Sequence, residues 1–447
     1  MVDDHDVPPV VVIDLDAYPS REPLGGAARR LPGERWWPFG LLLVGVLVLV
    51  VGARPVTPLA PSVVLRADGL SDIRSADHAI YLMTRTSLAS YRLPDGARRW
   101  AVPVPAGAQL VAVDGERVVF AQEPEIGPAS TLVGLDAATG AQVWRQIGYA
   151  PSFYGSAGAP GVVVADAYPP GADPVQERQR PSRHLAGINI RTGGVRWSLD
   201  TPLGGTRAIV PVESGEGSIR IELAELDPGG TLRVRSAESA EIVRSVQLDQ
   251  PGQVDGFEIS GDRLLTYQSG RDTILSSAVF DLATGRRLWQ RTDEPSGLAL
   301  WWCGLALCSS TTNTTVVLDP GTGRELWRLD GRWNGFGRLG DQYLLATRST
   351  PDFDESSVGG LVLDAPTGRI VRRIDGWNVI RGLGRSDLLV ARRTAAGGSL
   401  VARLNVETGG VTVLGRTEHG SFPSQCITTT RLLACQLDQV SIWPLPA

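Results

Sequence analysis

The chain has 447 residues, of which 43% are hydrophobic and 20% are charged, and this is the composition of a globular protein. Its formal net charge of −5 leaves no basic footprint for nucleic acid, which we therefore exclude as a partner. The 52 glycines, 31 prolines and 12 tryptophans indicate many short strands joined by turns, the pattern of an all-β protein.

Residues 1–35 form a polar N-terminal tail that is rich in proline and aspartate. Such a segment cannot bury enough apolar surface to fold alone, and so we expect a disordered cytoplasmic tail. A short β-prone run at residues 10–16 leaves an alternative open, in which the tail docks a cytoplasmic partner by strand addition.

Residues 36–53 are predicted to form a transmembrane helix. Two tryptophans and a proline precede an uncharged run, 39–53, that is dense in leucine and valine and just long enough to span a bilayer. Three arginines crowd its N-terminal flank and only Arg54 lies close on the other side, so the positive-inside rule exports the rest of the chain. The alternative is a cleaved signal peptide, because 51–53 resemble a small-residue cleavage site. A proline-rich spacer is expected over 54–61.

Residues 62–447 carry a recurring Asp-x-x-x-Gly-x-x-x-Trp pattern. In five copies the tryptophan is present, at Trp100, Trp144, Trp197, Trp289 and Trp327. Two further copies have Arg372 or Val413 at that position, and a degraded copy has Ser239 for glycine and Val243 for tryptophan. The copies recur at roughly 40 to 50 residues, which is the length of a four-stranded propeller blade.

The chemistry of the pattern predicts a turn between the third and fourth strands of each unit, C and D. Aspartate can accept backbone N–H bonds within a turn, and glycine tolerates positive φ at the tight position. The tryptophan then falls on strand D, where its ring can dock between neighbouring blades and contribute a few kcal/mol by burial. We therefore predict a β-propeller of four-stranded antiparallel blades.

The two ends of this region predict how the ring closes. Residues 431–435 and 440–443 resemble strands B and C with no strand D after them, and 62–66 is a candidate for the missing strand. Joining both ends in one sheet would remove the exposed edges of an open array. Taken literally this gives nine sheets, which is more than usual. We expect eight blades, with either one degenerate unit or the terminal strands in another role.

The copy at 281–289 resembles the tryptophan-docking repeat of the pyrroloquinoline-quinone-like (PQQ-like) β-propeller family, also called quinoprotein-alcohol-dehydrogenase-like. The resemblance covers about residues 62–446 and implies the fold. Enzymatic members hold the quinone over the central axis with Ca²⁺, a catalytic aspartate, a stacked tryptophan and often a disulfide between adjacent cysteines. This chain has no adjacent cysteine pair and no evident Ca²⁺ ligand cluster, so we expect no cofactor, no metal and no catalytic residues. Non-enzymatic members, such as the outer-membrane assembly lipoprotein, are protein-binding platforms.

The four cysteines are predicted to form two local disulfides, Cys303–Cys308 and Cys426–Cys435. Cys308 and Cys435 align as the same B strand of two units, and so each bridge would staple an A–B hairpin. Disulfides suit an exported domain. A zinc site is the alternative, which the spacing and the lack of a nearby histidine disfavour. The sequence has no Gly-x-Ser-x-Gly elbow, phosphate loop or His-Glu-x-x-His motif.

Two predicted B–C loops are long, 168–184 and 349–357. Together with the D–A connections they would lie on one face of the ring, which is the candidate face for a partner, although tolerated insertion is equally open. The sequence therefore favours a membrane-tethered, non-catalytic scaffold that binds another envelope protein or ligand outside the cell membrane. The alternatives are a quinone-dependent dehydrogenase and an envelope sensor that signals through its cytoplasmic tail.

Overall fold

The structure, a computed structural model, contains 36 β-strands in the part of the chain that it describes. The description covers residues 63–444 except 66–68, 77, 94, 123–129, 153–160, 169–181, 203–204, 214–218, 250, 270–273, 293–299, 311–313, 332, 334, 341, 349–358, 384–385, 395–397, 418–424, 429–431 and 437–439. The predicted tail, transmembrane helix and spacer lie outside these residues. Within the described residues, no helix has the length and apolarity that crossing a bilayer requires.

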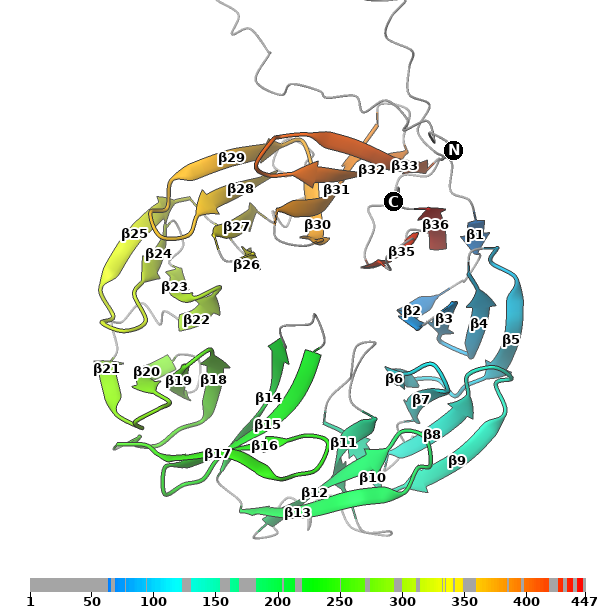
Figure 1. The fold of residues 1–447 in the computed structure, drawn as a ribbon, viewed down its shortest axis with the longest axis horizontal. Helices are drawn as coiled ribbons and strands as arrows, with labels where there is room; N and C mark the ends of the chain where they lie inside the picture. The colour runs from blue at the N-terminus through cyan, green and yellow to red at the C-terminus, as the bar shows by residue number, and fades with distance from the viewer. Residues whose placement is uncertain are drawn as a thin grey trace, which may run out of the picture.

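The strands form nine four-stranded antiparallel sheets, arranged as blades around a closed ring (Figure 1). Strand A of each blade lies nearest the ring axis and strand D forms the outer wall. The predicted β-propeller with four-stranded antiparallel blades is confirmed, whereas the predicted number of eight is wrong: the ring has nine.

Blades 1 to 8 each consist of four consecutive strands, A to D. Blades 1 to 3 comprise β2 (Leu70–Ala76), β3 (Ala79–Thr84), β4 (Ser87–Arg92), β5 (Arg98–Pro103); β6 (Gln109–Val113), β7 (Arg117–Gln122), β8 (Thr131–Asp136), β9 (Gln142–Ile147); and β10 (Tyr149–Pro151), β11 (Val162–Ala167), β12 (Ser182–Asn189), β13 (Val195–Pro202). Blades 4 to 6 comprise β14 (Thr206–Glu213), β15 (Ile219–Leu226), β16 (Thr231–Ser236), β17 (Ile242–Gln247); β18 (Gly256–Ser260), β19 (Arg263–Ser269), β20 (Ile274–Asp281), β21 (Arg287–Thr292); and β22 (Leu300–Cys303), β23 (Ala306–Ser310), β24 (Thr314–Leu318), β25 (Glu325–Asp330).

The remaining blades include the one that closes the ring. Blades 7 and 8 comprise β26 (Gly335–Leu339), β27 (Tyr343–Arg348), β28 (Gly359–Asp364), β29 (Ile370–Asp375); and β30 (Asn378–Gly382), β31 (Asp387–Arg393), β32 (Ser399–Asn405), β33 (Val411–Thr417). Blade 9 comprises β34 (Gln425–Thr428), β35 (Leu432–Gln436), β36 (Val440–Pro444) and β1 (Val63–Leu65), with β1 as its outer strand.

The core lies between the blades. Strands B and C have side chains buried on both faces, as in β3, where Ala79 to Met83 are all buried, because each sheet is covered by a neighbour on either side. Nine hydrophobic clusters of described residues fill the joints between consecutive blades. Outer strands such as β9 are half exposed, with alternate side chains facing solvent.

Blade 9 explains why the ring has nine blades. Val63 pairs with Ile442 and Leu65 pairs with Val440, so the N-terminal strand completes a sheet that the C-terminus leaves with three strands. Leu65 and Ile442 also pack against Ile80 of blade 1 in the joint that closes the ring. The degenerate repeat folds as a full sheet as well, β14 to β17, so no unit is lost from the count.

Candidate functional site

The joint between blades 2 and 3 shows how a docking tryptophan works. Trp144 on β9 is 7% exposed, and its indole N–H donates to the carbonyl of Ile190 at 2.9 Å. The ring lies between Gly134 of its own blade and Gly193 of the next, where a Cβ atom would clash with the indole. Gly193 also has a φ of 72°, so glycine satisfies both the backbone and the packing there.

Four more joints repeat this contact. An indole N–H donates to a carbonyl in the C–D turn of the following blade, at 2.8 to 3.0 Å, in the pairs Trp100–Ala137, Trp197–Ala237, Trp289–Pro320 and Trp327–Ala365. Burial of an indole contributes a few kcal/mol at each joint. The structure therefore gives the five motif tryptophans a role in holding the ring together, since ring and N–H both contact the neighbouring blade.

The joint between blades 7 and 8 uses an arginine in the same place. Arg372 on β29 pairs with Val362, the register position that holds tryptophan in the intact copies. Its Nε donates to the carbonyl of Val406 at 2.9 Å, and its guanidinium covers Gly409 of the next turn. A planar guanidinium with several N–H donors can replace an indole in both respects. The sequence marked this position as altered but did not predict that arginine would make the docking contact.

The repeat in blade 4 lies one residue later than the sequence predicted. Ala240, not Ser239, takes the glycine position: its φ is 61°, and its N–H donates to the carbonyl of Ser236 at 2.8 Å. Arg244 rather than Val243 then holds the tryptophan position, opposite β16. Without glycine or tryptophan to mark the register, only the spacing of the turn could have shown it.

The joint between blades 4 and 5 is held by main chain instead of a docking side chain. The Gln247 carbonyl lies directly against Gly285, and the Asp249 N–H donates to the Gly285 carbonyl at 2.9 Å. Leu232 and Phe280, both fully buried, fill the space behind this contact. Loss of the motif residues therefore changes the chemistry of the joint without opening the ring.

The aspartates of the C–D turns are bound within the turns. Asp136 accepts bonds through Oδ1 from the Thr139 hydroxyl and the Thr139 N–H, both at 2.9 Å, and Asp281 does the same with Thr284. The threonine hydroxyl first, and then the backbone N–H, hold the pKa of each carboxyl below its usual range. These carboxylates are therefore ionised turn-forming groups with no free proton to exchange near neutral pH.

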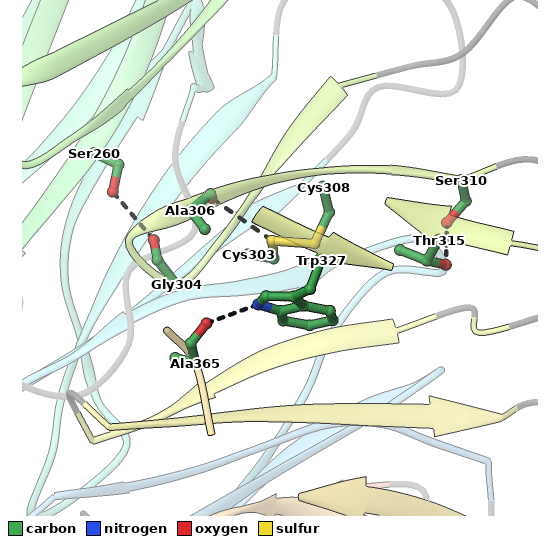
Figure 2. The surroundings of a disulfide bond; sticks show 9 residues. All are labelled: Ser260, Cys303, Gly304, Ala306, Cys308, Ser310, Thr315, Trp327 and Ala365. Carbon is green, nitrogen blue, oxygen red and sulfur yellow. Dashed lines mark hydrogen bonds between the residues drawn. A yellow bond between two sulfur atoms is a disulfide. The ribbon is translucent and has the colours of Figure 1, made fainter. Parts of the chain in front are cut away.

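Two disulfides staple A–B hairpins. Cys303 bonds to Cys308 in blade 6, and Cys426 bonds to Cys435 in blade 9. Figure 2 shows the first bridge beside Trp327, in the apolar joint between blades 6 and 7. All four cysteines are buried, with at most 8% exposed, which removes both bridges from easy contact with a thiol.

Ion pairs occupy the joint between blades 3 and 4. Asp166 on β11 accepts from Arg207 on β14 at 3.0 Å, and so links the two blades. Within blade 4, Arg235 donates to Glu225 at 3.0 Å. Asp166 and Glu225 each therefore have an arginine partner.

The predicted partner face is only partly described. Its two long B–C connections fall mainly on 169–181 and 349–358, which lie outside the described residues. Among the described residues, no group of three or more histidine, cysteine, aspartate or glutamate side chains could hold a metal ion. The face therefore stays a prediction.

A family profile described as "Outer membrane protein assembly factor BamB" matches residues 84–292 and 182–329, which together span more than half of the chain. The chain belongs to this PQQ-like β-propeller repeat family. A comparison with curated proteins returned no match.

The solved structures that resemble this chain are distant from it in sequence. BamB from Moraxella catarrhalis is 14% identical, with 87% of this chain and 99% of that chain covered and a TM-score of 0.41. The computationally designed Ika8 protein is 15% identical, with 75% and 95% covered and a TM-score of 0.41. A eukaryotic initiation factor is 11% identical, with 80% and 90% covered and a TM-score of 0.48.

The quinone and Ca²⁺ of the family's enzymes do not fit the residues described in this PQQ-like chain. Calcium takes six to eight oxygen ligands, several of them carboxylates. The described turn aspartates accept hydrogen bonds within their own turns. The two disulfides join cysteines five and nine residues apart, whereas the family's enzymes join adjacent cysteines.

Proposed function

We propose that this protein is a membrane-tethered scaffold that binds another envelope protein or ligand on its propeller without catalysis. The family match over residues 84–329 carries the proposal, because the matching profile is that of an outer-membrane protein assembly factor. The hydrogen bonds of the ring support it, because the motif tryptophans bind the neighbouring blade and the turn aspartates bind their own turns.

The proposal includes the location of the chain. A helix over 36–53 would anchor it in the cell membrane with residues 1–35 in the cytoplasm, and 54–61 would space the propeller, 62–447, away from the lipid. The two buried disulfides support this orientation, because such bonds persist in oxidising compartments.

Site-specific photo-crosslinking tests which face binds the partner. A photoreactive residue is placed at Arg85, Pro228 or Gln253, which are exposed in the B–C turns and a D–A connection. The matched controls are Ala138 and Ala283, exposed in C–D turns at the opposite face. We expect one discrete adduct in intact cells from the first set only, because partners contact the loops of a rigid ring.

Two outcomes would contradict the proposal. Adducts from neither face, together with quinone- and Ca²⁺-dependent dye reduction by the purified chain with alcohols or sugars, would assign the protein to the enzymes of the family. Equal adducts from both faces would refute the choice of face.

A further inference from the structure

We propose that the outer wall beside the tether, formed by β1, β5 and β9, docks onto an anionic lipid surface. The proposal rests on the proposed membrane tether and adds the orientation of the ring and a second membrane contact. These three strands follow one another along the outside of the ring in Figure 1. We call their exposed residues the tether-side wall.

The charge of this wall departs from that of the chain. Strands β1, β5 and β9 contain no aspartate or glutamate, although the whole chain has 48 acidic and 43 basic residues. Arg98, Arg99 and Arg145 are exposed on it, and none has an ion-pair partner among the described residues. On β25 and β29 of the opposite side, three arginines stand beside three acidic residues. Strands β17 and β21 also carry arginine without an acidic residue, so the wall is distinguished by its positive charge together with its position beside the proposed tether.

Exposed aliphatic side chains lie among these arginines. Val64, Val143 and Ile147 are 48%, 47% and 58% exposed. Arginine next to exposed aliphatic groups is the chemistry of a surface that binds lipid headgroups and inserts shallowly below them. An acidic protein partner would require only the arginines and would leave the exposed aliphatic side chains without a role.

The position of the tether brings this wall to the bilayer. The chain enters the ring at Val63, on the outer strand of blade 9, which is the first strand of the wall. Residues 54–62 separate it from the predicted helix and reach about 30 Å when fully extended. The wall therefore samples the headgroup region at high local concentration, and attraction of about fivefold per arginine suffices to hold it there.

Fluorescence energy transfer in nanodiscs tests the docked orientation with the full chain. A donor dye is attached to A101C on β5 or, as the matched control position, T292C on β21 across the ring, both exposed. An acceptor dye labels the headgroups of phosphatidylcholine discs with or without phosphatidylglycerol. We expect stronger transfer from position 101, increased by phosphatidylglycerol and lost at high salt.

Charge-matched variants identify the residues responsible. R99Q/R145Q removes two arginines from the wall, and R244Q/R373Q removes two exposed arginines from other outer strands that likewise have no ion-pair partner among the described residues. Because each arginine contributes about fivefold, R99Q/R145Q should lower the ratio of docked to released chain about 25-fold, whereas R244Q/R373Q should leave this ratio unchanged.

Two results would overturn the inference while leaving the tether intact: equal transfer from positions 101 and 292, or equal effects of the two variants. Release of the chain from membranes by alkaline carbonate would instead refute the tether itself, and the inference with it.

Discussion

Replacing Trp144 by alanine should show how much one docking indole contributes to the ring. The side chain is 7% exposed, and its N–H bonds to the Ile190 carbonyl in the next blade at 2.9 Å. An indole buries about 150–250 Å², which at about 25 cal/mol per Å² gives about 4–6 kcal/mol as an upper bound. The hydrogen bond adds about 1 kcal/mol, and measured Trp→Ala costs of about 3–5 kcal/mol place the loss near 4 kcal/mol.

Urea unfolding followed by circular dichroism measures this loss, and two variants calibrate it. W144F keeps most of the buried area but leaves the Ile190 carbonyl without its donor, and so should cost about 1–2 kcal/mol. V143A alters the exposed neighbour on the same strand and should stay within about 0.5 kcal/mol of wild type. If W144A were no less stable than V143A, the docking indoles would not hold the blades together and the structural role assigned to the motif would fail.

Three further predictions concern the turns and the closing blade. Removing the Cys426–Cys435 bridge by a double alanine substitution should cost about 2–3 kcal/mol, the loop-closure value for a separation of nine residues. The loss is measured as a lower urea midpoint without reductant, where the Cys303–Cys308 bridge stays intact, and an unchanged midpoint would contradict it. The pKa of Asp136 in the folded chain lies below its unfolded value of about 4, so its contribution to the free energy of unfolding is present above about pH 4 and is lost as the pH falls through the folded pKa. D136N, which mimics the asparagine of the Asn189 turn, should make the free energy of unfolding less dependent on pH in this acid range. A pH profile equal to that of wild type would contradict this. A240G should raise the unfolding free energy by about 1 kcal/mol because it relieves the left-handed backbone, and a loss in the same urea titration would contradict the assigned register.

The sequence predicted the blade because its turn chemistry is local. Asp281, Thr284 and Gly285 form their hydrogen bonds within one turn, so the residues that specify it are adjacent and repeat along the chain. The number of blades is not a local property. Blade 9 joins β1 to β36 across the whole sequence and has no C–D turn; its terminal strands were recognised, but eight blades were expected because nine is more than usual.

The inter-blade contacts were predicted only where a tryptophan marked them. Arg372 makes the same contact with different chemistry, and the joint after blade 4 uses the Gln247 carbonyl and Asp249 N–H, which carry no side-chain signal. The inter-blade contact of Trp443 was not predicted either, although this residue is a tryptophan. It is fully buried against Gly415 of blade 8, yet lies on strand C, outside the recurring pattern.

The closing blade holds the N-terminal strand β1, which would follow the proposed tether, through contacts that its disulfide does not include. The Cys426–Cys435 bridge joins β34 to β35, the two strands nearest the axis, whereas β1 is held by three paired residues on β36. Leu65 adds the apolar contact that locks β1 against blade 1. Tension on the N-terminal segment would therefore act first on the β1–β36 pairing and on Leu65, while the stapled hairpin keeps the inner strands together. The strength of the attachment of β1 thus depends on packing at the outer wall, in the same region as Arg98, Arg99 and Arg145.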